Sequence, residues 1–270
     1  MFKKLERGAS SALLARIAAS YLPGGPRAPL LTGSAELRGL FQTLPVHALP
    51  RLTQAPAGPQ ALADFASLGA GAARHEAYVR ALQALGSHTV TGQVWMVASA
   101  HPGAGGAATA AALAGLCAAH GRRVVLVDAD LRRRRLHAAF DAAPQPGLAE
   151  ILQHEASWPQ ALKPLEAHRF LLLPAGTSAL GAGALAQPAL AAMLAELRGY
   201  YDLVLVVLPA QALAVGGLCA HTDHALIVTR AGHTPLAACT EPLRAARAER
   251  VAACAVVVEG AEYGDLAHSS

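Results

Sequence analysis

SAHPGAGGAAT, residues 99–109, is the stretch of sequence that decides the fold of this chain. It follows an apolar run at residues 94–98 and precedes an alanine-rich segment that ends near His120. A buried strand, a glycine-rich turn and a helix N-terminus, in this order, form a loop whose backbone N–H groups can face a phosphate. Such a loop normally carries Lys and then Ser or Thr, but this sequence has Gly106 and Ala107 there. The stretch therefore predicts the frame of a phosphate-binding loop without its charged contact.

Downstream of Gly92, apolar runs of strand length alternate with segments of helix length. The predicted strands are residues 94–99, 123–127, 170–173, 203–208, 225–229 and 252–258. The predicted helices are residues 107–120, 147–153, 188–197 and 235–247, with a shorter one at 135–140. Continuous apolar strands separated by helices are typical of a parallel sheet that is covered on both faces. We expect an α/β fold of three layers, with the loops after the strands gathered at one edge of the sheet.

The region before residue 73 has a different character. Residues 2–22 can form an amphipathic helix with apolar positions such as Phe2 and Leu5 and basic positions such as Lys3 and Arg16. Such a helix docks on a membrane surface, on a partner or on its own domain, and the sequence leaves these alternatives open. Residues 23–72 are rich in proline and glycine and contain short helical patches. We expect an extension at residues 1–72, a domain at 73–262 and a tail at 263–270.

The composition limits the functional classes. Hydrophobic residues make up 53% of the 270 residues, which is enough for a large core. The net charge of +4 is small and only 4% of the residues are aromatic, so no nucleic-acid surface is indicated. The four cysteines lie far apart and are expected to be reduced thiols. No stretch is long and apolar enough to be a membrane span, and we expect a cytoplasmic location.

Two acidic residues and an arginine run follow the second predicted strand. Asp128 and Asp130 are two residues apart at a strand end, where carboxylates can orient a metal-bound water near a phosphate or simply cap a turn. The run at residues 132–135 could bind a phosphate, an acidic partner or an anionic membrane, or form a solvated face. The strand at 203–208 ends at Val207 and Leu208, which cannot ligate Mg²⁺. No metal site and no catalytic residue is predicted.

Together these motifs resemble the bacterial tyrosine kinases of capsule and exopolysaccharide synthesis, which are related to the deviant-Walker ATPases that position plasmids and division sites. The first family loop, Ser-x-x-Pro-Gly-Glu-Gly-Lys-Ser/Thr, resembles residues 99–107. The second, Asp-Ala-Asp-Leu-Arg-Arg-Pro-x-x-His-x-x-Phe, resembles residues 128–140. Shorter similarities lie at residues 76–78, 147–148, 174–176 and 228–235. The resemblance covers about residues 73–258 and implies a P-loop NTPase-like fold, with residues 1–72 as a helical or irregular extension.

The resemblance also implies a nucleotide site, built from Gly103, Gly105, Gly106, Ala107, Ala108, Asp128, Asp130 and Arg132. The departures from the family pattern fall on this site. Gly106 replaces the phosphate-binding Lys, Ala107 the Mg²⁺-binding Ser or Thr, Ala104 the loop Glu and Val207 the distal Asp. The expected assembly pattern has Val79 and Leu82 in its arginine positions, and the tyrosine-rich tail is reduced to Tyr263. We therefore expect a degenerate site, and neither ATP nor Mg²⁺ is assigned as a cofactor.

Three functions remain open from the sequence. The first is a catalytically silent tyrosine-kinase-like protein that serves polysaccharide biosynthesis and export as a cytoplasmic partner of a membrane-anchored co-polymerase, or chain-length, protein, located at the inner face of the plasma membrane. The second is an active tyrosine kinase or ATPase of the same pathway that uses residues 132–135 in place of the missing Lys. The third is a positioning or adaptor protein of the partition and division type, docked on the membrane through residues 2–22. A homo-oligomer is compatible with each function.

Overall fold

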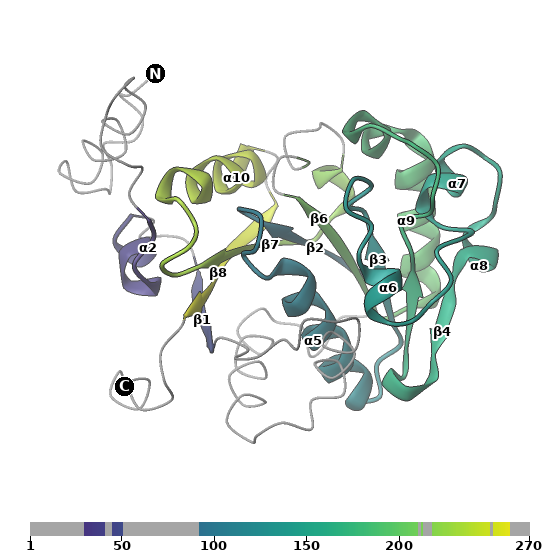
Figure 1. The fold of residues 1–270 in the computed structure, drawn as a ribbon, viewed down its shortest axis with the longest axis horizontal. Helices are drawn as coiled ribbons and strands as arrows, with labels where there is room; N and C mark the ends of the chain where they lie inside the picture. Colours follow the sequence, from purple (N-terminus) through teal and green to yellow (C-terminus); the bar gives the residue numbers. More distant parts are fainter. Residues whose placement is uncertain are drawn as a thin grey trace.

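A computed structural model describes residues 30–40, 45–50, 92–209, 212, 218–248 and 251–259. They form an eight-stranded sheet with helices on both faces (Figure 1). The strand order is β1-β8-β7-β2-β6-β3-β5-β4, and all neighbouring strands are parallel except β4 and β5. The predicted α/β fold with a mainly parallel central sheet is confirmed.

The bounds of the elements agree closely with the sequence pattern after Gly92. The strands are β1 (Val46–Pro50), β2 (Gln93–Ser99), β3 (Val124–Asp128), β4 (Lys163–Leu165), β5 (Phe170–Leu173), β6 (Leu203–Pro209), β7 (His224–Arg230) and β8 (Ala252–Glu259). The α-helices are α2 (Ser34–Leu40), α5 (Gly106–Ala119), α6 (Leu136–Ala139), α7 (Leu148–Leu152), α8 (Trp158–Ala161), α9 (Pro188–Tyr200) and α10 (Leu236–Ala248). Short 3₁₀ turns lie at η2 (Glu166–His168), η3 (Ala182–Ala186) and η5 (Cys219–His221). Among the strands and α-helices, β1, β4 and α8 were not predicted from the sequence.

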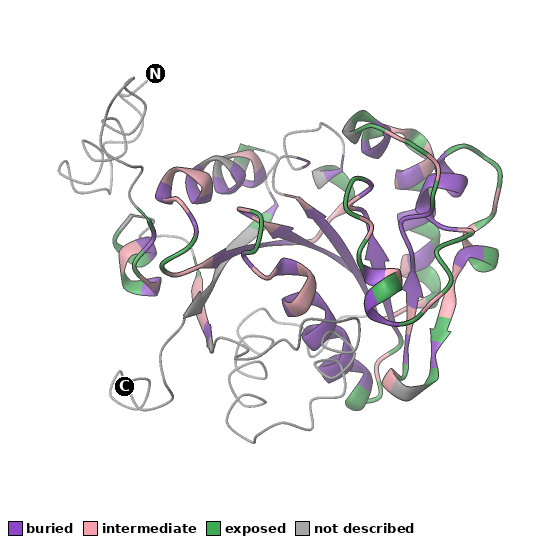
Figure 2. Ribbon diagram, viewed as in Figure 1, coloured by how far each residue is buried: buried purple, intermediate pink, exposed green. Residues whose placement is uncertain are grey.

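The two faces of the sheet are covered by different helices. Side chains alternate between the faces along each strand, so Val94 and Met96 pack in one core with α2, α7, α9 and α10, whereas Trp95 and Val97 pack in a second core with α5 and α6. The central strands and α5 are buried over most of their length (Figure 2). This burial on both faces explains why the strands are apolar without alternation.

Part of the predicted N-terminal extension belongs to the sheet. Strand β1 pairs in parallel with β8, and the N–H of Leu31 donates to the carbonyl of Thr234 over 2.9 Å. The predicted helix at residues 2–22, the predicted boundary at residue 72 and the tail at 263–270 lie outside the described residues. Within the described part of the chain, no helix has the length and apolar character needed to cross a membrane.

The start of α7 crosses the loop after β5 at very close range. The N–H groups of Leu148 and Ala149 donate to the carbonyls of Pro174 and Ala175 over 2.7 and 2.9 Å. A Cβ atom on Gly147 would lie 2.3 Å from the nitrogen of Gly176 and 2.5 Å from the oxygen of Pro174. Only glycine therefore fits at position 147 without moving the backbone.

We predict that Gly147→Ala lowers the free energy of unfolding by about 3 kcal/mol, because the added methyl group overlaps backbone atoms that cannot rotate away. Urea denaturation measures the change. Gly181→Ala is the control, since a Cβ atom at Gly181 meets nothing within 4 Å, and we expect it to change stability by less than about 0.5 kcal/mol. Equal effects of the two substitutions would contradict the close crossing.

Candidate functional site

The loop between β2 and α5 has the backbone shape of a phosphate-binding loop. Gly103 and Gly105 adopt left-handed conformations with φ of 84° and 97°, which glycine accepts without strain. The N–H of Ala104 donates to the carbonyl of His101 over 3.0 Å, and the N–H of Thr109 donates to the carbonyl of Gly105 over 2.9 Å. The chain then enters α5, whose first N–H groups have no partner within the helix. This geometry could cradle a phosphate group through backbone donors.

Position 106, where a phosphate-binding loop carries its lysine, is closed by Ser99. The N–H of Gly106 donates to Ser99 Oγ over 3.2 Å. A Cβ atom on Gly106 would lie 2.3 Å from that Oγ and 3.2 Å from the Ser99 nitrogen. The loop in this form has no room for a side chain at position 106, and glycine fits it.

The positions that would ligate Mg²⁺ hold apolar side chains. Val207 is 5% exposed and belongs to the core that α5 covers. Ala107 is partly buried and packs against the same core. Strand pairing aligns Val207 with Val97 of β2 on one side and with Asp128 of β3 on the other. Asp128 is therefore the one carboxylate among these three aligned side chains.

Asp128 stabilises the loop that follows it. Its carboxylate accepts the N–H of Leu136 over 3.0 Å and the N–H of Asp130 over 3.1 Å. Burial raises the pKa of the Asp128 carboxyl to about 6, because the backbone donors offset only part of the lost hydration. Asp130 in turn accepts the N–H of Arg133 over 3.1 Å. Both predicted acidic site residues thus hold a turn at the same sheet edge as the glycine-rich loop.

The structure separates the arginine run into two kinds of residue. Arg134 has a φ of 48° and turns inward, where its guanidinium donates to the carbonyls of Leu131, Thr177 and Ser178. Arg132, Arg133 and Arg135 are exposed. Arg134 therefore connects two loops, whereas Arg132, the predicted site residue, lies on the surface.

Glu150 is a buried carboxylate that the sequence analysis missed. It accepts hydrogen bonds from the N–H groups of Gly147, Thr177 and Ser178 over 2.8, 3.0 and 3.1 Å. Burial alone would raise the pKa of Glu150, but these donors outweigh it and lower the pKa to about 2. Arg134 donates to the carbonyls of Thr177 and Ser178, and Glu150 accepts the N–H groups of the same two residues. The loop after β5 is therefore held from both sides. The glutamate three residues after Gly147 was the available signal, since this spacing is common at helix starts.

Two histidines contact the glycine-rich loop. His233, in the loop between β7 and α10, has its Nε2 2.9 Å from the carbonyl oxygen of Pro102, and His101 Nδ1 is 3.0 Å from the same oxygen. The two rings lie edge to face with centroids 5.4 Å apart. A Cβ atom on Gly103 would lie 2.9 Å from His233 Nε2. The loop is thus packed against a neighbouring loop that the sequence analysis connected with it only by resemblance.

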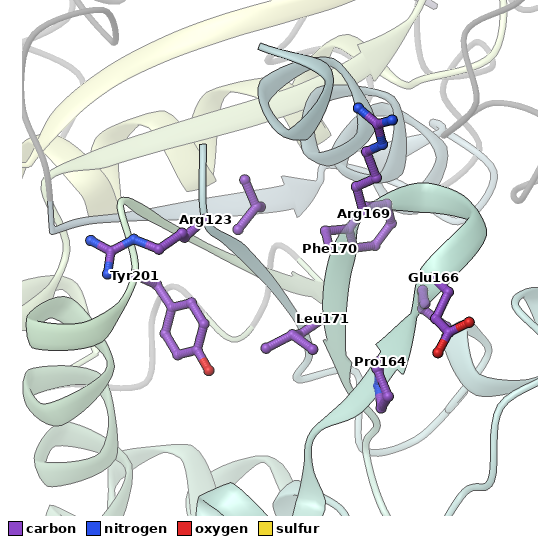
Figure 3. Close-up of a pocket in the computed structure, with 9 residues that line it drawn as sticks. Arg123, Pro164, Glu166, Arg169, Phe170, Leu171 and Tyr201 are labelled. Atoms are coloured by element: carbon purple, nitrogen blue, oxygen red, sulfur yellow. The ribbon is translucent and has the colours of Figure 1, made fainter. Parts of the chain in front are cut away.

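A groove of about 240 Å³ lies at the opposite edge of the sheet. It is formed by the start of β3, by β4 and β5, and by Tyr201 (Figure 3). Its lining is mainly apolar, with Arg123, Glu166 and Arg169 among the lining residues. The groove is separated from the glycine-rich loop by the length of the strands.

Comparisons with known proteins agree with this geometry. The chain is 37% identical over 149 residues to the succinoglycan biosynthesis transport protein ExoP of Rhizobium meliloti, an alignment that covers 53% of this chain and 19% of ExoP. It is 43% identical over 68 residues to the tyrosine-protein kinase YwqD of Bacillus subtilis, covering 25% of this chain and 29% of YwqD. The kinase domain of the Escherichia coli tyrosine kinase Etk superposes with a TM-score of 0.70 at 20% identity, covering 85% of this chain and 95% of that domain.

This chain is thus similar in sequence to part of a bacterial tyrosine kinase and in fold to the kinase domain of another. The predicted resemblance and the predicted P-loop NTPase-like fold are confirmed. The matched part corresponds to about a fifth of ExoP and less than a third of YwqD. No family model matches the chain. The tyrosine-kinase-like fold is therefore established. The roles in nucleotide binding stay predictions for Gly103, Gly105, Gly106, Ala107, Ala108, Asp128, Asp130 and Arg132.

We predict that Glu150→Gln destabilises the fold most strongly at neutral pH. The pKa of Glu150 is about 2, below its ordinary value of 4.5, so the ionised carboxylate contributes roughly 3 kcal/mol to stability. This contribution is complete above about pH 4.5 and is lost as the pH falls toward about 2. Thermal unfolding at pH 7 and pH 4 should show a smaller difference between wild type and variant at the lower pH. The exposed Glu155→Gln is the control, and a pH-independent effect of Glu150→Gln would contradict the role of the charge.

We predict that Arg134→Ala lowers the free energy of unfolding by about 2 kcal/mol, because three backbone carbonyls lose a charged donor. Arg133→Ala removes the same charge from an exposed neighbour, and we expect a change below about 0.5 kcal/mol. Chemical denaturation of both variants makes the comparison. A loss of stability in Arg133→Ala equal to that in Arg134→Ala would show that Arg134 does not connect the two loops.

Proposed function

We propose that this protein is a catalytically silent, tyrosine-kinase-like binding partner in exopolysaccharide or capsule biosynthesis and export. The relatives named for succinoglycan transport and tyrosine kinase activity support the pathway. In this proposal the chain acts at the inner face of the plasma membrane and binds a membrane-anchored co-polymerase that sets polysaccharide chain length. The kinase-like fold supplies the surface that binds the co-polymerase, and the protein does not catalyse phosphoryl transfer.

The observation that carries the proposal is the chemistry at positions 106, 107 and 207. Gly106 has no side-chain cation, and the side chains of Ala107 and Val207 have no oxygen that could bind Mg²⁺. Phosphoryl transfer depends almost entirely on positioning and on neutralisation of charge at the phosphates. Loss of one preorganised stabilising group costs roughly a hundred- to a thousandfold in rate. Three such groups are missing from one site.

Arg134 of the arginine run does not favour the active-enzyme alternative. Arg134 uses its guanidinium on the carbonyls of Leu131, Thr177 and Ser178, so it is engaged in holding two loops together. Asp128 and Asp130 add negative charge beside any phosphate at the glycine-rich loop, since strand pairing places them at the same sheet edge. Without the lysine, the glycine-rich loop offers a phosphate only backbone N–H groups.

Isothermal titration with ATP and Mg²⁺ tests the proposal. We expect no saturable binding by the wild type at concentrations up to about 1 mM, because the charged contacts that usually supply several kcal/mol are absent. The triple variant Ser99→Ala/Gly106→Lys/Ala107→Thr restores the lysine and the hydroxyl and removes the Ser99 Oγ that occupies the space at position 106. We expect it to bind ATP at least about tenfold more tightly than the wild type.

Ser99→Ala alone is the matched control and should behave as the wild type does. Incubation with radiolabelled ATP and phosphotyrosine detection complete the experiment. Micromolar binding of ATP by the wild type together with phosphorylation of tyrosine on the protein or a partner would overturn the proposal.

A further inference from the structure

The arginines at the two edges of the sheet differ in their partners. At the amino edge, Arg123 pairs with Asp202 over 2.8 Å, and Arg198 pairs with Asp223 over 3.0 Å. At the carboxyl edge, Arg132, Arg133 and Arg135 are exposed and, among the described residues, their guanidinium groups have no hydrogen-bond or ion-pair partner. Two arginines of the amino edge are thus ion-paired, while Arg169 at that edge is exposed, as Arg132, Arg133 and Arg135 are at the carboxyl edge.

The free arginines belong to a wider basic edge. Arg230 ends β7, and the run at 132–135 follows β3; the two strands are parallel members of one sheet, so these residues lie at the same edge. Acidic residues at this edge are Asp130, Glu36, which accepts hydrogen bonds from Thr32, and Glu259 at the end of β8. The five arginines outnumber these three carboxylates. We call residues 132–135 and Arg230 the basic edge.

An exposed apolar side chain lies at this same edge. Leu30 is 44% exposed and forms a bridge with Pro235, just beyond the end of β7. The sequence before Leu30 carries Lys3, Lys4, Arg7 and Arg16 among apolar residues. Basic charge combined with apolar side chains is the combination that binds anionic lipid. An acidic protein partner would explain the arginines but not the exposed leucine.

We propose that the basic edge faces an anionic membrane surface, with Arg132, Arg133 and Arg135 as the contacts to lipid phosphates. In this orientation the glycine-rich loop and the loop after β7 also face the lipid, since they lie at the same edge of the sheet. The amino edge, with its paired arginines and the apolar groove, points away from the membrane. The inference does not depend on the proposed loss of catalysis, because lipid binding requires no nucleotide.

Vesicle co-sedimentation of the full chain tests this orientation. The vesicles contain either phosphatidylcholine alone or phosphatidylcholine with about 30% phosphatidylglycerol, and the salt concentration is about 0.15 M. Each arginine near an anionic surface contributes about 1 kcal/mol, which is about fivefold in partitioning. We expect wild type to bind the anionic vesicles and Arg132→Glu/Arg133→Glu to bind them at least about tenfold more weakly.

The matched control reverses two charges at the amino edge, with Arg122→Glu/Arg169→Glu, since Arg122 precedes β3 and Arg169 precedes β5. Both variants change the net charge equally, and circular dichroism melting checks that each is folded. We expect the control to bind anionic vesicles within about twofold of wild type, because its charges lie at the far edge of the sheet. An equal loss in both variants would mean that net charge alone drives binding and would overturn the proposal.

Two further outcomes would also overturn the proposed membrane orientation. One is that the wild type fails to bind anionic vesicles, and the other is that it binds neutral and anionic vesicles equally. A parallel titration with a poly-glutamate peptide examines the other class of partner. Binding of this peptide without binding of anionic vesicles would assign the basic edge to an acidic protein.

Discussion

The lateral pairing of β2, β6 and β3 is the constraint on which the candidate site depends. These strands are buried on both faces, and their register places Val97, Val207 and Asp128 side by side. Because the strands are parallel, the loops that follow them open at one edge. The glycine-rich loop, the turn at Asp128 and the basic residues after it are neighbours for this reason. A fold of this kind keeps its loops close together whether or not they still carry catalytic side chains.

The polar interactions at this edge now serve the protein's own backbone. Asp128 accepts two N–H groups of its own turn, and Glu150 and Arg134 bind opposite sides of the loop after β5. Ser99 Oγ accepts the N–H of Gly106 at the start of α5. Charged groups that are saturated by backbone partners are poorly suited to capture a phosphate, since each contact with a ligand would first require a contact to break. Asp128, Glu150 and Arg134 are thus engaged within the protein, and the exposed Arg132, Arg133 and Arg135 are the charged groups of the run left for an outside partner.

The sequence was sufficient for the central strands and their helices because each is a continuous apolar run next to a glycine or charged boundary. It was insufficient for β1 and β4, which lie at the sheet edges and are short, and whose prolines Pro50 and Pro164 argue locally against a strand. Glu150 and Arg134 were missed as a pair because their partners are backbone atoms some 27 to 44 residues away in the chain. Resemblance identified Gly147, Pro174 and Gly176, but only the fold shows that these residues cross.

The contact between Ser99 and Gly106 has a consequence for what a change at position 106 would require. A lysine at position 106 does not fit while the Ser99 hydroxyl occupies its present place, because the first side-chain carbon would overlap that oxygen. The family loop carries both the serine and the lysine, so rotation of the serine side chain is enough to admit the longer residue. That rotation would break the hydrogen bond between Ser99 Oγ and the N–H of residue 106. The same hydroxyl thus fills the space of the missing side chain and occupies a backbone donor that would otherwise face a ligand.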